Sequence, residues 1–253
     1  MVHLIACRIE TEERMENLRL VVKHLKDVGD KIFVGEFDKE RKIFLDDVMY
    51  MFEKDDKELF HRTKHFNTML SKVENKIIGL TDCDVLIAKE QLKEAQRMIE
   101  EDNYDVVYPY QDNGFIMTEP LFRERYKEEG NFDFVKRHGW SHSELMKPSR
   151  GSTSTGGCCI LKRSSWIEAG GENENMIGWA ADDWERRDRM KILGYKQGRV
   201  QGWLLHLYHP RGSNSCDKCP TYNETMDIWR MVSKMTETEL RRYIEKWEWK
   251  SRL

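Results

Sequence analysis

The stretch KIIGLTDCD, residues 76–84, is a short apolar run that ends in two carboxylates separated by one residue. Short apolar runs bounded by polar turns are typical of buried strands. Along the first 110 residues, such runs alternate with segments that carry apolar residues at helical spacing. The expected strands are 3–7, 31–37, 76–80 and 104–110, and the expected helices are 12–28, 54–75 and 89–102. This alternation predicts an α/β fold with a mixed, mainly parallel sheet flanked by helices, in which ligands bind at the carboxyl ends of the strands.

The second half of the chain is less regular. Residues 113–154 show no clear period, and the run GSTSTGG at 151–157 indicates either a linker or the loop of a site. The elements expected after it are strand 158–162, helix 164–169, helix 181–193, a strand-like stretch to residue 209 and an amphipathic segment 224–249. Because no repeat occurs and sheets with covering helices often reach this length, we expect one domain, 1–253.

The composition excludes several classes of protein. With 42 Lys and Arg against 45 Asp and Glu, the net charge of −3 offers no general basic field for nucleic acid. Hydrophobic residues make up 39% of the chain and include eight Trp, which suffices for a core and excludes disorder. The sequence holds no apolar run of about eighteen residues and starts with nothing like a signal peptide, so no integral membrane segment is expected.

The cysteines indicate a reduced, cytoplasmic protein. Six cysteines in 253 residues lack the density and the secretory context of a disulfide scaffold. Cys216 and Cys219 form a CxxC, but a structural zinc site needs four ligands and no second pair follows.

Asp82 and Asp84 stand where the backbone leaves the expected strand 76–80. At that position their carboxylates could bind one cation, and the cation could in turn hold phosphate oxygens. A solvated turn with an Asx cap is the alternative.

Three further segments carry polar groups of interest. FHRTKHFN at 60–67 is either a functional helix or an ordinary charged one, and GWAADDWE at 178–185 places two adjacent acids at a helix start, where capping alone would explain them. HLYHPR at 206–211 contains two histidines three residues apart. His206 and His209 can face one ion only if the backbone turns there, as the following proline favours; otherwise they are core and surface residues.

In this order the motifs resemble the GT-A glycosyltransferases. The resemblance is closest to the metal-dependent inverting galactosyltransferases and the polypeptide N-acetylgalactosaminyltransferases, and it covers about residues 3–211. The matching parts are the basic stretch after the first strand with Arg8 and Arg14, the FHRTKHFN helix, Asp82-Cys83-Asp84, the segment from Thr155 to Gly171, the element Trp179–Asp183, and His206 with His209. The chain departs from the pattern at Ala180 and Asp182, where the family has Gly and Glu, and residues 111–150 match no part of it.

The resemblance implies a role for each matching residue. Metal ligands would be Asp84, His206 and His209, and oxygen together with imidazole suits Mn²⁺, with Mg²⁺ as a substitute. Asp183 would be the general base that removes the acceptor's proton in an inverting transfer. Asp82 would approach the ribose or a metal-bound water, Trp179 would lie against a sugar ring unless it is a core aromatic, and Asp182 would bind hydroxyls. The other candidate substrate-binding residues are Arg8, Arg14, Arg62, Asn67 and Gly157, together with Glu36, which ends the second strand and either contacts the nucleotide base or is an exposed charge.

We therefore expect a glycosyltransferase that moves a sugar from a UDP-linked donor to a hydroxyl group, as on a glycan. Residues 1–112 would form the nucleotide-binding half, 113–211 the acceptor and catalytic half, and 212–253 a C-terminal helical segment. One alternative is a nucleotidyltransferase, although its Gly-rich phosphate loop is absent after the first strand. The other is a nucleotide-sugar binding module without turnover.

Overall fold

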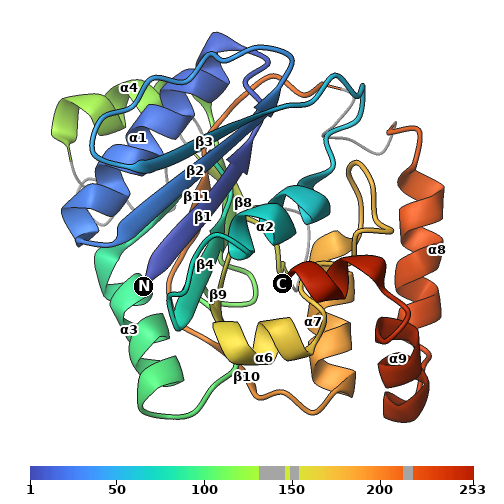
Figure 1. Ribbon diagram of the computed structural model, residues 1–253. Coiled ribbons are helices and arrows are strands. Elements are labelled where there is room, and N and C mark those ends of the chain that lie inside the picture. Colours follow the sequence, from blue (N-terminus) through green and yellow to red (C-terminus); the bar gives the residue numbers. More distant parts are fainter. Residues whose placement is uncertain (131–145, 149–153, 213–218) are drawn as a thin grey trace.

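The fold is built on a seven-stranded sheet (Figure 1). The computed structural model describes residues 1–130, 146–148, 154–212 and 219–253. From one edge to the other, the strands are β10 (Gln197–Arg199), β6 (Val106–Tyr108), β9 (Cys158–Lys162), β4 (Ile77–Thr81), β1 (Val2–Cys7), β2 (Lys31–Asp38) and β3 (Met49–Lys54). Only β9 runs antiparallel to its neighbours. The prediction of an α/β fold with a mixed, mainly parallel sheet is confirmed.

A second, four-stranded sheet carries part of the site. Its order is β5 (Val85–Ile87), β11 (Leu204–His206), β7 (Phe115–Thr118) and β8 (Met146–Pro148). Because β5 begins one residue after Asp84, and His206 pairs in register with Val85, this sheet brings two distant motifs together.

Helices cover the large sheet, with α1 and α4 to its left in Figure 1 and α2, α7, α8 and α9 to its right. The helices are α1 (Glu12–Val28), α2 (Arg62–Leu70), α3 (Lys89–Glu100), α4 (Pro120–Glu129), α6 (Arg163–Glu168), α7 (Asp182–Ile192), α8 (Tyr222–Val232) and α9 (Glu237–Ile244), followed by the 3-10 helix η2 (Glu248–Arg252). In the described part of the chain, no helix is both long and apolar enough to cross a bilayer.

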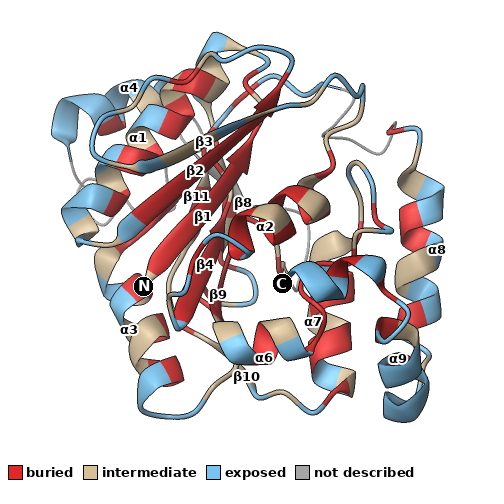
Figure 2. Ribbon diagram, in the orientation of Figure 1, coloured by how far each residue is buried: buried red, intermediate tan, exposed pale blue. Residues whose placement is uncertain are grey.

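The core lies between the sheet and these helices. Strands β1 and β2 are buried along nearly their whole length, whereas α8 and α9 expose one face (Figure 2). Helix α1 buries its apolar stripe, and its ends follow local rules: Thr11 caps it, and Gly29 ends it at φ 93°, a conformation that favours glycine.

Two expectations about elements are wrong. The expected helix 54–75 is shorter, because α2 spans only Arg62–Leu70. Lys54 is the last residue of β3, and residues 55–61 form neither helix nor strand. The charged run after β3 suits a helix by composition, but the backbone N–H of Asp55 donates to the Asp38 carbonyl and continues the pairing with β2. The expected amphipathic segment 224–249 divides into α8 and α9, because Thr236 begins a new helix with a capping box.

Candidate active site

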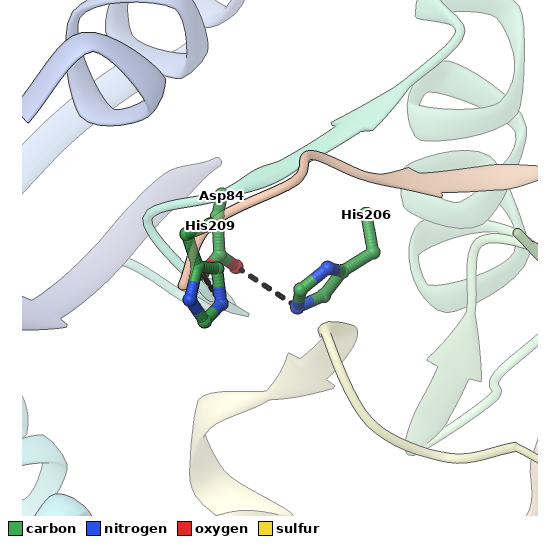
Figure 3. Close-up of side chains that lie close together, drawn as sticks. All are labelled: Asp84, His206 and His209. Atoms are coloured by element: carbon green, nitrogen blue, oxygen red, sulfur yellow. Dashed lines mark ion pairs between the residues drawn. The ribbon is translucent and has the colours of Figure 1, made fainter. Parts of the chain in front are cut away.

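Asp84, His206 and His209 converge at the carboxyl end of β4 (Figure 3). The Asp84 carboxylate lies 3.6 Å from Nε2 of His206 and 3.2 Å from Nε2 of His209. One ligand-type atom from each of the three residues lies within 4.8 Å of the others. The carboxylate and the His209 ring are buried, which shields the cluster from water.

The two histidines meet because the chain continues along Asp84 after β11. The strand ends at His206, and the backbone N–H of Leu207 donates to the Asp84 carbonyl at 2.7 Å, which continues the pairing with β5. The Asn17 side chain then holds the Tyr208 carbonyl at 3.1 Å. No turn is assigned to residues 207–209, yet both rings face the same carboxylate.

The protonation states suit a divalent cation. Nδ1 of His209 donates to the Pro210 carbonyl at 2.8 Å, which leaves Nε2 as the ring atom that faces Asp84. Burial lowers the pKa of His206. Burial alone would raise the pKa of Asp84, but His206, His209 and Arg14 outweigh it and hold that pKa well below its usual range. Oδ1 of Asp84 is buried without a hydrogen-bond partner among the described residues, so one anionic oxygen is left for an ion.

A cavity of about 150 Å³ adjoins this cluster on the side of β1. Its cationic lining residues are Arg8, Arg14 and Arg62. Arg14 lies 3.6 Å from Asp84, and Arg8 is held by Asp55 at 2.9 Å and by the Phe37 carbonyl at 3.1 Å. The cavity thus presents three guanidinium groups beside the acidic cluster, a pattern that suits an anionic ligand.

Arg62 joins three carboxylates. Its Nε and Nη2 donate to Asp82 at 3.1 and 2.9 Å. Its Nη1 donates to Asp182 at 2.7 Å and to Asp183 at 3.4 Å. The residue that begins α2 therefore bridges the turn after β4 and the start of α7.

The adjacent acids of α7 differ in their surroundings. Burial raises the pKa of Asp182, and the charge of Asp183 raises it further. Burial would also raise the pKa of Asp183, but Arg62 and Arg186 outweigh it and lower that pKa. Asp183 is therefore the more acidic of the two and the more readily available as a carboxylate.

A second cavity, of about 500 Å³, lies on the other side of the cluster. Asp183 lines it together with Gly156 and Gly157, and its aromatic lining residues are Phe115, Trp179, Trp184 and Tyr222. Trp179 is 39% exposed and stacks on Tyr222 with the ring centroids 6.0 Å apart. Asp82, Trp179, His206 and His209 line both cavities, whereas Asp84 lines only the first. The two histidines of the cluster therefore stand at the common wall.

Gly157 lies in the wall of the second cavity. It adopts φ 80°, and a Cβ there would come within 2.9 Å of Leu204. A side chain at this position would therefore be strained and crowded.

Three of the candidate residues line neither cavity: Glu36, Asn67 and Asp182, of which Asp182 pairs with Arg62 at 2.7 Å. Glu36 is fully buried and accepts hydrogen bonds from the backbone of Lys42 and Ile43 and from the Tyr50 hydroxyl. The alternative of an exposed charge is thus wrong, and its carboxylate holds the loop after β2. Asn67 is buried too, and its amide group bonds the segment at Glu172.

Some residues of the site carry little signal in the sequence. Tyr222 and Met226 line the second cavity from α8, far along the chain from every motif. Arg186 lies three residues after Asp183, one turn along the helix, and this spacing is the sequence signal for their contact. Cys216 and residues 151–153 lie outside the described residues; Cys219 is buried, and its sulfur accepts a hydrogen bond from the Trp179 N–H.

The sheet, the carboxylates after β4 and the histidines after β11 form the arrangement that the resemblance to GT-A glycosyltransferases implies. Residues 137–211 match the family model described as the N-terminal domain of galactosyltransferase. No protein with a curated description has a matching sequence.

Solved glycosyltransferase structures share the fold. The catalytic domain of Drosophila β1,4-galactosyltransferase 7 with xylobiose has 15% identity and a TM-score of 0.56, over 94% of this chain and 82% of that chain. S. aureus TarS 1–349 with UDP-GlcNAc has 11% identity and a TM-score of 0.59, over 94% and 68%. GalNAc-T7 with UDP, GalNAc and Mn²⁺ has 14% identity and a TM-score of 0.58, over 96% and 50%. The predicted resemblance is confirmed: the chain has the GT-A fold, and together with the matched segment this supports a glycosyltransferase.

Proposed function

We propose that the protein is a metal-dependent, inverting glycosyltransferase that moves a sugar from a UDP-linked donor to a hydroxyl group of a glycan. The single observation that carries the proposal is the convergence of Asp84, His206 and His209, whose two histidines lie in the wall shared by two cavities. One cavity is rich in arginine, as a diphosphate requires. The other combines a carboxylate with aromatic rings, as a sugar acceptor requires.

In the donor cavity, the arginines would bind the nucleotide diphosphate. Arg8 and Arg14 project from the segment after β1, and their fork-shaped groups suit phosphate oxygens. Asp84, His206 and His209 would hold Mn²⁺, with Mg²⁺ as a substitute, and GalNAc-T7 of the same fold was solved with UDP and Mn²⁺. When bound, the ion would neutralise the charge that develops on the departing diphosphate.

In the acceptor cavity, Asp183 would remove the proton of the attacking hydroxyl. Its lowered pKa keeps it ionised near neutral pH, and it lies at the wall of the cavity. Trp179 would lie against a sugar ring, because its half-exposed face stands between the two cavities. Asp182 would bind hydroxyl groups.

The proposal divides the chain as follows. Residues 1–112 form the nucleotide-binding half, 113–211 the acceptor and catalytic half, and the C-terminal helical segment 212–253 adds Tyr222 and Met226 to the acceptor cavity. The cytoplasmic location stays a prediction; the five described cysteines are free.

A thermal-shift screen of nucleotide sugars with and without Mn²⁺ tests the function. We expect a UDP-sugar to raise the melting temperature more with Mn²⁺ than with a chelator. With that donor and a panel of oligosaccharides, the enzyme should release UDP and extend one of them. Release of pyrophosphate from a nucleoside triphosphate and a sugar phosphate would instead indicate a nucleotidyltransferase. Binding without turnover across the panel would indicate a binding module.

A further inference from the structure

A chain of buried polar side chains leads from α2 to Asp183. The Asn67 side chain accepts from the Glu172 N–H at 2.8 Å and donates to the Glu172 carbonyl at 2.9 Å. The Glu172 carboxylate accepts from Nη1 of Arg186 at 2.9 Å, and Nη2 of Arg186 donates to Oδ1 of Asp183. Asn67, Glu172 and Arg186 are each at most 2% exposed, so the chain has little freedom to move.

This chain separates the two oxygens of Asp183. Arg186 and Arg62 both donate to Oδ1. Oδ2 faces Gly156 in the wall of the second cavity, where an added Cβ would lie 2.8 Å from it. One oxygen is therefore held from behind while the other stands at the cavity.

Stability alone explains this arrangement poorly. A buried ion pair contributes little net stability, because desolvation offsets the attraction. Here Oε1 of Glu172 and Nε of Arg186 also lack hydrogen-bond partners among the described residues. The atoms of Glu172 and Arg186 that do form hydrogen bonds are those that connect Glu172 to Arg186 and Arg186 to Asp183.

The close approach of Asn67 to the chain depends on a glycine. Gly171 adopts φ 68°, and a Cβ there would lie 2.5 Å from Oδ1 of Asn67. The segment before Glu172 is thus shaped to bring its backbone against Asn67.

We propose that Glu172 and Arg186 are positioning residues that orient Asp183 so that Oδ2 meets the acceptor hydroxyl. The inference rests on the proposed role of Asp183 as general base. It also gives Asn67 a role: Asn67 orients Glu172 from outside the cavities and touches no substrate.

The charges around Asp183 decide how a substitution changes its titration. Arg62 faces it from α2, Arg186 and Asp182 from α7, and Asp82 contributes from the turn after β4. Removing the Arg186 cation raises the pKa of Asp183, so the acidic limb of kcat/KM moves to higher pH. Replacing Glu172 by glutamine leaves the cation in place and does not move the limb upward.

The test compares kcat, acceptor KM and pH profiles of three variants. In Arg186→Met we expect kcat to fall about tenfold to a hundredfold, as misplacing a catalytic group does, with acceptor KM near wild type and the acidic limb at higher pH. Arg186→Lys keeps the charge but not the fork, so its limb should return to the wild-type position while kcat recovers only in part. Glu172→Gln should lower kcat several-fold without an upward shift of the limb.

Glu174→Gln is the matched control. It removes a carboxylate on the same segment that contacts Asn67 and Arg252 but not Arg186, and we expect wild-type kinetics. UDP binding with Mn²⁺ should be unchanged in all four variants. Wild-type kcat in Glu172→Gln and Arg186→Lys would overturn the inference, even if Arg186→Met failed to fold. A wild-type protein that binds UDP but transfers no sugar would instead overturn the proposed function.

Discussion

The two carboxylate oxygens of Asp183 have different surroundings. Two arginines hold Oδ1, and Oδ2 lies at the wall of the second cavity. The arginines lower its pKa despite burial, whereas burial and the neighbouring charge raise the pKa of Asp182. Two adjacent residues of one helix thus acquire opposite titration behaviour from their contacts alone.

Asp183→Asn should therefore lower turnover by at least about a hundredfold, because general-base assistance is typically worth about 10² to 10⁴ in rate. The amide keeps the shape but cannot take the proton. Steady-state kinetics measures the loss, and calorimetry with UDP and Mn²⁺ should give wild-type donor affinity. NMR of the wild-type product should report an inverted anomeric configuration. Normal turnover in Asp183→Asn, or a retained configuration, would leave both acids as structural ion-pair partners of Arg62 and Arg186.

The two histidines should not be equal. His209 lies nearer to the Asp84 carboxylate than His206 does, 3.2 against 3.6 Å, and is more deeply buried. We therefore expect His209→Ala to weaken Mn²⁺-dependent UDP binding more than His206→Ala, and Asp84→Ala to abolish the dependence on Mn²⁺. Calorimetry of UDP with Mn²⁺ and with a chelator measures this. Equal UDP affinity in both buffers for the wild type would contradict metal binding at this cluster.

At the scale of elements, the N-terminal cap of α1 connects stability to the donor cavity. Thr11 accepts from the Arg14 N–H at 3.3 Å, and the Arg14 side chain enters that cavity. Thr11→Ala should lower the free energy of unfolding by about 1 kcal/mol, the usual value of an N-cap, and should also weaken UDP binding.

Thr236→Ala is the comparison for this cap. Thr236 caps α9 and lines neither of the two cavities. A similar loss of stability is expected, with UDP binding unchanged. Urea denaturation and calorimetry of both variants decide the point. If the two variants bind UDP equally well, α1 does not position Arg14 for the nucleotide.

At the scale of the whole molecule, buried histidines make stability depend on pH. Burial lowers the pKa of His24, His61 and His65, in the last case to about 2. Below about pH 6.5 these histidines take up protons in the unfolded chain but not in the folded protein. The free energy of unfolding therefore decreases as the pH decreases, until the folded-state pKa is reached. The raised pKa of Asp182 acts in the opposite direction and compensates in part.

We therefore expect the free energy of unfolding to decrease between pH 7 and 5, by up to about 1.4 kcal/mol per pH unit for each uncompensated histidine. Urea denaturation in a chelating buffer measures the slope. His65→Phe should make it shallower, because the ring already stacks on Phe37 at 3.8 Å and phenylalanine binds no proton. An unchanged slope in this variant would mean that the pKa of His65 is the same in the folded and unfolded states, against the lowering inferred from its burial.

Much of the nucleotide-binding half could be predicted from local pattern. The expected helix 12–28 matches α1, because its apolar spacing, cap and terminal glycine are local signals. The start of α2 could not be predicted, because residues 55–61 favour a helix by composition but are held by long-range contacts, such as those of Asp55 with Asp38 and Arg8. The motifs from Asp82 to His209 could be found in the sequence because each consists of neighbouring residues, and all of them lie in the candidate site.

The sequence by itself predicted the class of fold and the acidic turn after β4, and its resemblance to GT-A glycosyltransferases added Asp84, His206 and His209 as candidate metal ligands. Only the tertiary structure decided that His206 and His209 face one carboxylate, because that depends on the pairing of β11 with β5 and on the path of the chain after it. It also decided that Asn67 and Glu36 stand outside the cavities and that Tyr222 belongs to one of them. The physical reason is that strand and helix periods are local, whereas pairing, burial and charge balance join residues far apart in the chain.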